Sequence, residues 1–151
     1  ITLVGVNCAA AAVTMVALHN LFIVNKAGGL IYHKSFSASS SLGGNDALRL
    51  ASTFHSLYAI AAQISPVSAS TGIEFLQADN FRLYCFQTAT NIKFFATAPA
   101  DSQELDGFLR KVYELYADYV LKNPFYELDQ VIKCDLFDLH LDSLVSGSAR
   151  A

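Results

Sequence analysis

The chain has 151 residues, of which 53% are apolar and only 15% are charged, and its formal net charge is −3. This length corresponds to one domain with a sizeable core, and the acidic balance excludes the basic surface that nucleic acid binding requires. Because its three cysteines, Cys8, Cys85 and Cys134, form no C-x-x-C pair, the sequence indicates a cytoplasmic protein without a disulfide framework.

The low charge content has a consequence for the surface. Soluble domains usually contain about 25% charged residues, and a chain with fewer is expected to cover part of its apolar surface with a partner. A well-filled core is the other explanation, and composition alone does not separate the two. No apolar run reaches the ~18 residues of a membrane span, so we expect none.

Residues 1–14 are apolar and rich in alanine, as signal peptides are, but no Lys or Arg precedes Lys26. A signal peptide needs a positively charged beginning. We therefore interpret residues 1–14 as an N-terminal extension and Met15 as the natural start. The domain is expected to extend over residues 15–145, followed by a small polar tail, residues 146–151, that frays.

A β-hairpin is predicted at the start of the domain. Residues 18–24 and 30–34 are rich in β-branched and aromatic side chains, and the Gly-Gly turn between them supplies positive φ. After a Ser/Gly loop, Asn45 is expected to cap a helix whose apolar residues recur at i, i+3, i+4 and i+7. Pro66 should end this helix, because the residue before a proline avoids the α region.

Three further strands and two helices are predicted in the second half of the chain. The expected strands span residues 73–78, 81–88 and 92–98. A long helix is expected over residues 102–122, with Asp101 and Glu104 as a capping box, and a short helix over residues 134–144. The order β-β-α-β-β-β-α-α is most simply buried as an α+β fold, a five-stranded antiparallel sheet covered by helices.

Two patterns that could bind phosphate or metal are incomplete. The segment from Gly29 to Ser35 has the length of a phosphate-binding loop, but it is strand-like and leads into no helix. The histidines are His19, His33, His55 and His140, each in a different predicted element. They lack the spacing that places two metal ligands on one helical face.

Side chains that could support catalysis are equally scattered. Asp135, Asp138 and Asp142 recur on the last predicted helix, where a solvated acidic face is the simpler interpretation than a metal site. Cys85 and His55 could meet in space as nucleophile and base, but the sequence offers the thiol no activating surroundings. We predict no enzyme activity and no catalytic, cofactor-binding or metal-binding residues.

Four segments of the chain are distinctive when they are taken together and in order. They are residues 24–32 (VNKAGGLIY), 50–60 (LASTFHSLYAI), 84–94 (YCFQTATNIKF) and 108–113 (FLRKVY), the last continuing into LKNPFY at 121–126. These segments resemble the synbindin family, whose members are subunits of the TRAPP vesicle-tethering complex. Four colinear segments are a more specific signal than any single short motif.

The resemblance implies a longin-like fold, related to SNARE regulatory domains and profilin, with one helix on one face of the sheet and two on the other. It further implies a non-catalytic core subunit in ER-to-Golgi transport, peripheral to ER and cis-Golgi membranes. The implied partners are other TRAPP subunits and, through the assembled complex, a Rab GTPase whose nucleotide exchange the complex supports. Many family members carry a large insert after the second strand, where this chain has only residues 37–45, so no function of the insert is transferred.

Another longin-type protein, such as a SNARE regulatory domain or a clathrin-adaptor small chain, stays an alternative. The last residues, 146–151, contain neither heptads nor a membrane anchor, which disfavours a full-length SNARE. We expect the partner interface on the first helix, near the hairpin, and in the loop after residue 122. The expected interface residues are Leu57, Tyr58, Ile60, Asn123, Phe125 and Tyr126. Phe125 and Tyr126 could instead fold back over the core.

Overall fold

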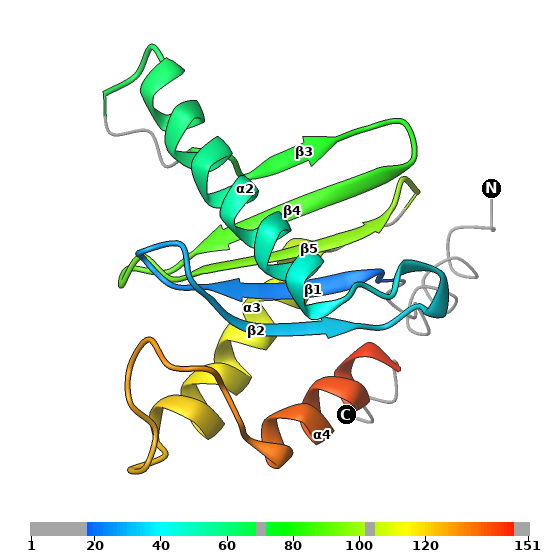
Figure 1. Ribbon diagram of the computed structural model, residues 1–151, viewed down its shortest axis with the longest axis vertical. Coiled ribbons are helices and arrows are strands. Elements are labelled where there is room, and N and C mark those ends of the chain that lie inside the picture. Colours follow the sequence, from blue (N-terminus) through cyan, green and yellow to red (C-terminus); the bar gives the residue numbers. More distant parts are fainter. Residues whose placement is uncertain (1–17, 69–71, 102–104, 147–151) are drawn as a thin grey trace, which may run out of the picture.

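The computed structural model describes residues 18–68, 72–101 and 105–146 of the chain. The strands are β1 (Asn20–Val24), β2 (Leu30–Ser35), β3 (Phe75–Gln77), β4 (Phe81–Gln87) and β5 (Lys93–Pro99). The helices are the short η1 (Ala38–Ser40), α2 (Gly44–Ile64), α3 (Leu105–Leu115), η2 (Tyr116–Leu121) and α4 (Asp135–Val145). All strand pairs are antiparallel, in the order β2-β1-β5-β4-β3 (Figure 1), which confirms the predicted sheet.

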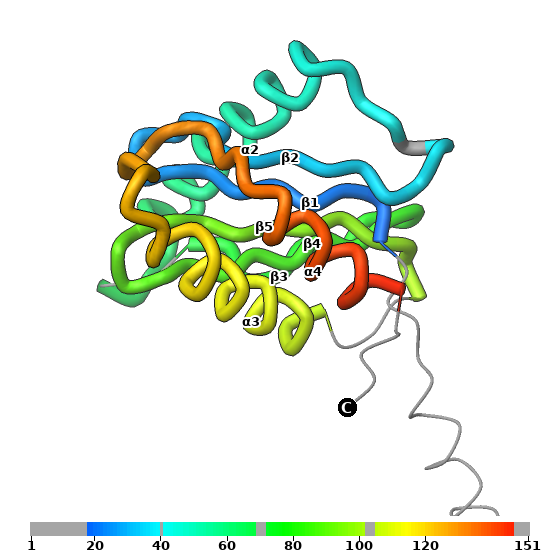
Figure 2. Tube along the Cα trace, turned by 90° about the horizontal axis from the view of Figure 1, so that it is seen from below, coloured from blue at the N-terminus to red at the C-terminus, as the bar shows by residue number. Residues whose placement is uncertain are grey.

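The helices form two layers, one on each face of the sheet. Helix α2 covers one face, while α3 and α4 lie side by side on the other (Figures 1 and 2). The sequence produces this because successive side chains of a strand point to opposite faces. In β1, Leu21 and Ile23 join the core under α3 and α4, whereas Phe22 and Val24 join the core under α2.

Helix α2 begins one residue before its predicted cap. Gly43, with φ −64° and ψ 157°, occupies the N-cap position, and Ala47 N–H donates to its carbonyl at 3.0 Å. The prediction that Asn45 caps the helix was therefore wrong, because Asn45 already lies in the first turn. The predicted end is confirmed: the helix stops at Ile64, and Ser65 before the proline has left the α region with ψ 132°.

The long helix predicted over residues 102–122 is divided in the structure. An α-helical part, α3, passes at Tyr116 into the π-helical turn η2, which keeps both Tyr116 and Val120 buried against the core. The expected capping box lies partly outside the described residues, because Glu104 is not among them.

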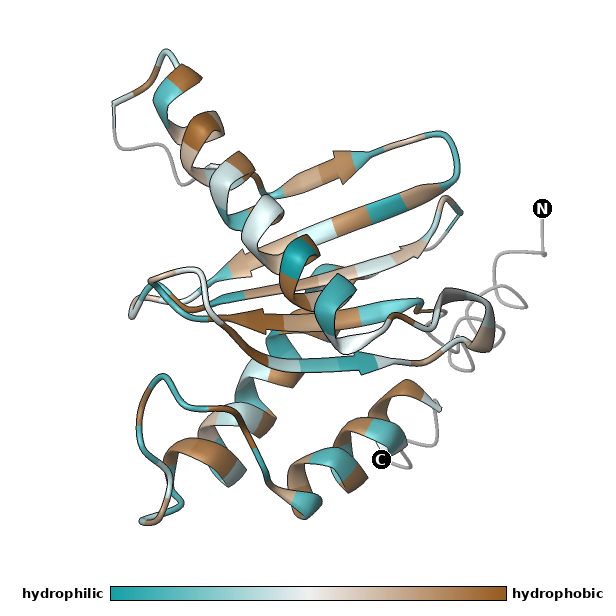
Figure 3. Ribbon diagram, viewed as in Figure 1, coloured by the Kyte–Doolittle hydropathy of each residue, from teal (hydrophilic) through white to brown (hydrophobic). Residues whose placement is uncertain are grey.

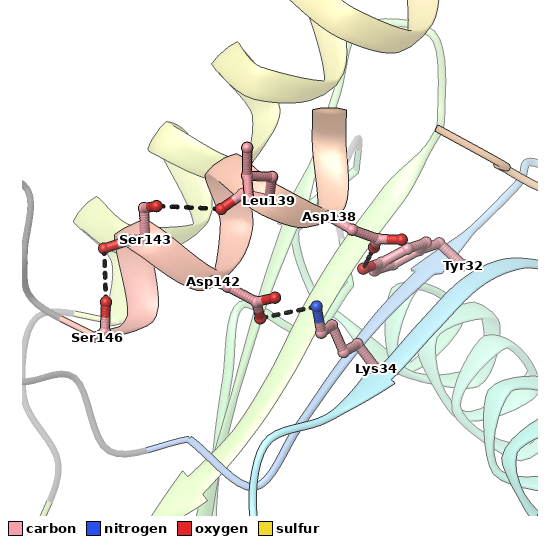
Figure 4. Close-up of polar contacts among 7 residues, drawn as sticks. All are labelled: Tyr32, Lys34, Asp138, Leu139, Asp142, Ser143 and Ser146. Atoms are coloured by element: carbon pink, nitrogen blue, oxygen red, sulfur yellow. Dashed lines mark hydrogen bonds and ion pairs between the residues drawn. The ribbon is translucent and has the colours of Figure 1, made fainter. Parts of the chain in front are cut away.

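Two polar contacts and two apolar anchors attach α4 to the sheet. Phe137 and Leu141 are fully buried in the core beneath the helix. On the side facing β2, the Tyr32 hydroxyl donates to Asp138, and the Lys34 ammonium lies 2.7 Å from the Asp142 carboxylate (Figure 4). The aspartates at this spacing thus help to dock the helix, beyond the purely solvated role expected for them.

Candidate protein-interaction surfaces

An apolar stripe runs along the exposed side of α2, next to the residues that the helix buries. Its large members are Leu50, Leu57, Ile60 and Ile64, at helical spacings of three, four and seven. Leu57 is 41% exposed and Ile60 is 51% exposed. Brown, apolar segments accordingly recur toward the C-terminal end of α2 in Figure 3. A stripe of this kind on a domain surface is typical of a protein contact.

Leu50 and Leu57 of this stripe form one wall of an apolar groove between α2 and the β3–β4 hairpin. The groove has a volume of about 490 Å³, and the other wall consists of Leu76, Phe81 and Leu83. Polar residues of several segments, among them Ser41, Thr53 and Thr97, contribute only a small part of its lining surface. Apolar side chains of a partner could therefore be buried here without stranding polar groups.

The strand beside this groove, β3, forms one edge of the sheet. The backbone N–H and C=O groups of two of its residues point away from the sheet. Cys85 N–H donates to the Glu74 carbonyl at 2.9 Å, and Ala78 N–H donates to the Phe81 carbonyl at 3.0 Å. Since antiparallel bonding alternates, the backbone groups of Phe75 and Gln77 point away from β4. The opposite edge is partly covered, because Ile132 N–H donates to the Ile31 carbonyl at 2.9 Å.

Tyr58 does not share the exposure of its neighbours on α2. The side chain is only 8% exposed, and its hydroxyl donates to Gln87. Its ring lies 4.9 Å from the Lys93 ammonium, and burial raises the pKa of the phenol to about 12. Of the three α2 residues expected at the interface, Leu57 and Ile60 are exposed to solvent, whereas Tyr58 is buried in the core between α2 and the sheet.

The loop after η2 presents a second apolar surface. Asn123 fixes its conformation: its side-chain oxygen accepts from Phe125 N–H at 3.1 Å, and its carbonyl accepts from Tyr126 N–H at 3.2 Å. Tyr126 packs against the core and donates to the Gln130 carbonyl at 2.9 Å. Phe125, by contrast, is 92% exposed. The loop therefore uses one aromatic side chain to cover the core and offers the other to solvent.

The structure does not bring the two groups of expected interface residues together. Leu57 and Ile60 belong to α2, whereas Phe125 follows η2, the continuation of α3. Helices α2 and α3 lie on opposite faces of the sheet (Figure 2). Sequence patterns do not identify Leu76 and Phe81 as groove residues, because a strand pattern does not show that β3 lies at an edge of the sheet or that α2 crosses beside β3 and β4. Leu50 was visible in the helical pattern but was counted with the core residues.

Cys85 and His55, the two side chains that could have formed a catalytic pair, contribute to packing in the structure. Burial raises the pKa of the Cys85 thiol to about 12, which keeps it protonated and a poor nucleophile. The pKa of His55 is lowered by burial and then by Lys93, and its ring packs against Gly28. The segment with the length of a phosphate-binding loop forms strand β2 from Leu30 to Ser35.

Neither a metal site nor a membrane-spanning helix is present in the part of the chain that the structure describes. Among residues 18–68, 72–101 and 105–146, no three His, Cys, Asp or Glu side chains converge as a metal site would require. Within the same ranges, no helix is both long enough and apolar enough to cross a bilayer.

Comparison with known proteins identifies close relatives. The model of the Sybindin-like family matches residues 18–148. Trafficking protein particle complex subunit 4 of Dictyostelium discoideum is 52% identical over 129 residues, covering 85% of this chain and 96% of that protein. The human subunit 4 is 52% identical over 110 residues, covering 73% of this chain but only 50% of the human protein. Subunit 1 of Dictyostelium discoideum is 28% identical over 141 residues, covering 87% of this chain and 99% of that protein.

Solved structures share the fold at low sequence identity. A roadblock/LC7 domain from Streptomyces avermitilis superposes with a TM-score of 0.52 at 13% identity, covering 72% of this chain and 92% of that domain. A structure described as MglB with tetrameric arrangement gives a TM-score of 0.51 at 11% identity, covering 70% and 78%. These values support the longin-like and roadblock-like fold and nothing about function.

Proposed function

Because this chain belongs to the Sybindin-like family, we propose that it is a non-catalytic subunit of a trafficking protein particle complex, in the position of subunit 4. The observation that carries the proposal is the 52% identity to the Dictyostelium subunit 4 over 96% of that protein's length. Only half of the human subunit's length is matched, so nothing that depends on its other half is assigned to this chain.

The complex would act at ER and cis-Golgi membranes, with this subunit peripheral to the bilayer. There it would contribute part of a composite surface that promotes nucleotide release from a Rab GTPase. No proton transfer or covalent step is required of the subunit. A surface that binds the nucleotide-poor GTPase better than the nucleotide-bound form shifts the population toward release.

The α2–β3 surface, defined as the α2 stripe, the groove and the β3 edge, is suited to contact with another subunit of the same fold. A subunit 1 chain resembles this chain over 99% of its own length, so a complex can contain two such domains. The outward backbone groups of Phe75 and Gln77 could pair with a partner strand, while Leu57 and Leu76 are buried beside it.

The Phe125 loop lies on the other side of the sheet and stays accessible when the α2–β3 surface is occupied. An exposed aromatic side chain on a loop held by its own hydrogen bonds is ready to bind without further ordering. We assign this loop to the face that meets the GTPase.

Reconstitution of the complex with and without this chain tests the exchange role. Omitting the chain should slow nucleotide release, and Phe125→Ala should slow it about tenfold while the complex still assembles. Lys111→Met, a change at an exposed position on α3, serves as the control and should leave release unchanged. Unchanged release from an assembled complex that lacks the chain would refute the exchange role.

A further inference from the structure

Among the residues that the structure describes, Lys93 is the charged side chain that lies buried without an ion pair. It begins β5 and is only 5% exposed. The three ion pairs among the described residues involve Lys34, Arg110 and Lys122, so Lys93 takes part in none of them. Holding an ammonium group in a largely buried side chain without a carboxylate partner is costly, and most proteins avoid it.

The surroundings of Lys93 offer only weak compensation. Its ammonium lies 4.9 Å from the centre of the Tyr58 ring, a cation–π contact. Across the sheet it is paired in register with Gln87, whose amide donates to the Asn91 side chain at 2.7 Å and whose oxygen accepts from Tyr58. Its other neighbour, Cys85, remains a neutral thiol. None of these groups carries a negative charge.

A pocket of about 470 Å³ opens beside these residues, where β4 extends beyond the short β3. Tyr58, Cys85 and Gln87, which surround Lys93, form its inner wall. On the rim, the Asp106 carboxylate is held 3.2 Å from Arg110. Glu74 is the other rim carboxylate, and it is exposed to solvent. The pocket thus has room for a side chain and lies next to a buried positive charge.

We propose that this pocket receives an acidic side chain from a partner subunit, with Lys93 as the buried counter-charge. The isolated chain then bears the cost of an unpaired ammonium, and assembly relieves it. This inference rests on the proposed function, because it needs a protein partner on the edge of the sheet that holds β3 and β4. The choice of a carboxylate follows from charge complementarity: Lys93 supplies a positive charge that no ion pair among the described residues neutralises, since Asp106 is paired with Arg110 and Glu74 forms no ion pair with Lys93.

Substitution of Lys93 by Met separates this role from a purely structural one. Met keeps most of the length of the side chain and removes the charge. We expect Lys93→Met to raise the Tm of the isolated full chain by about 2–5 °C. The same change should weaken binding to the other subunits of the complex about tenfold or more, measured by calorimetry. Lys111→Met, at an exposed position, should change neither quantity.

A lower Tm together with unchanged affinity would overturn the inference, since Lys93 would then serve only the fold. Glu74→Gln tests the chain's own rim carboxylate as the counter-charge. If Glu74→Gln lowers Tm and Lys93→Met removes that effect, the pair is internal and the proposal is wrong.

A soluble carboxylate keeps the inference testable even if the proposed function fails. If the wild-type chain binds no subunit, about 100 mM acetate, compared with chloride at equal ionic strength, replaces the partner. A Tm increase in the wild type that Lys93→Met abolishes supports an anion-accepting pocket. Equal Tm values in the two salts would overturn it.

Discussion

Gly28 shows how one residue positions the candidate interface. It has φ +92° in the turn between β1 and β2, a conformation that side chains other than glycine rarely adopt. A Cβ atom at this position would lie 2.7 Å from Cδ2 of His55, in the middle of α2. The turn and the helix that carries the exposed stripe therefore fit together only because residue 28 is glycine.

Replacing Gly28 by Ala should destabilise the fold by about 1–3 kcal/mol, because it combines positive φ with a steric clash. Urea unfolding of the full chain measures the change. Gly44→Ala is the matched control, since a Cβ there meets nothing within 4 Å. A control as damaging as Gly28→Ala would show that the close packing against His55 does not matter.

The burial of Tyr58 predicts a loss of stability at alkaline pH. The pKa of the phenol is raised by burial to about 12 in the folded chain, against about 10 in the unfolded chain. The folded state therefore keeps a proton that the unfolded state has released. This contribution is complete below about pH 10 and is lost as the pH rises through about 12.

Between about pH 9 and pH 12, the free energy of unfolding of the wild type should fall by about 2 kcal/mol more than that of Tyr58→Phe. Urea titrations at several pH values provide the measurement. Parallel pH profiles for the two proteins would mean that Tyr58 titrates normally and is not buried as described.

At the scale of elements, α4 illustrates why an apolar pattern alone does not identify a core face. Leu139 and Leu141 lie on the same helix two positions apart, yet Leu139 is exposed and Leu141 is fully buried. The difference is decided by the docking of α4 onto β2 through Tyr32 and Lys34 (Figure 4). In the Tyr32–Asp138 contact, the two residues that meet are more than 100 positions apart in the sequence.

We expect Leu141→Ala to cost about 2–5 kcal/mol of unfolding free energy, because it leaves a cavity in the core. Leu139→Ala should change it by less than about 0.5 kcal/mol. Thermal or urea unfolding of both variants in parallel tests the position of α4. Equal losses from the two substitutions would mean that the helix does not dock with Leu141 inward.

Local sequence rules predicted most elements and failed where distant contacts decide. The Gly-Gly turn marked the hairpin formed by β1 and β2, and Pro66 marked the end of α2, because both effects are local. The burial of Tyr58 and Lys93 depends on how α2 crosses β4 and β5, which no short segment encodes. The interface residues themselves stay a prediction: the structure shows which of them are exposed, and exposure alone does not identify a partner.

At the scale of the whole molecule, the described residues present an apolar surface on each side of one sheet. The α2–β3 surface joins a groove to an open strand edge, and the Phe125 loop projects from the α3 and α4 side. A domain with two such surfaces can bind two partners at once without moving any element. This arrangement suits the proposed role of a subunit that connects its neighbours in a complex. Such a role does not need an active site in the subunit.

The most direct test of this account is the mass of the complex formed with a subunit 1 chain of the same organism, measured by size-exclusion chromatography with light scattering. We predict a stable one-to-one complex that Leu57→Lys disrupts. Ser52→Lys, on the side of α2 away from the stripe, should leave it intact, and both variants should keep wild-type stability within about 0.5 kcal/mol. A wild-type chain that stays alone, or a Leu57→Lys variant that binds as the wild type does, would contradict the account.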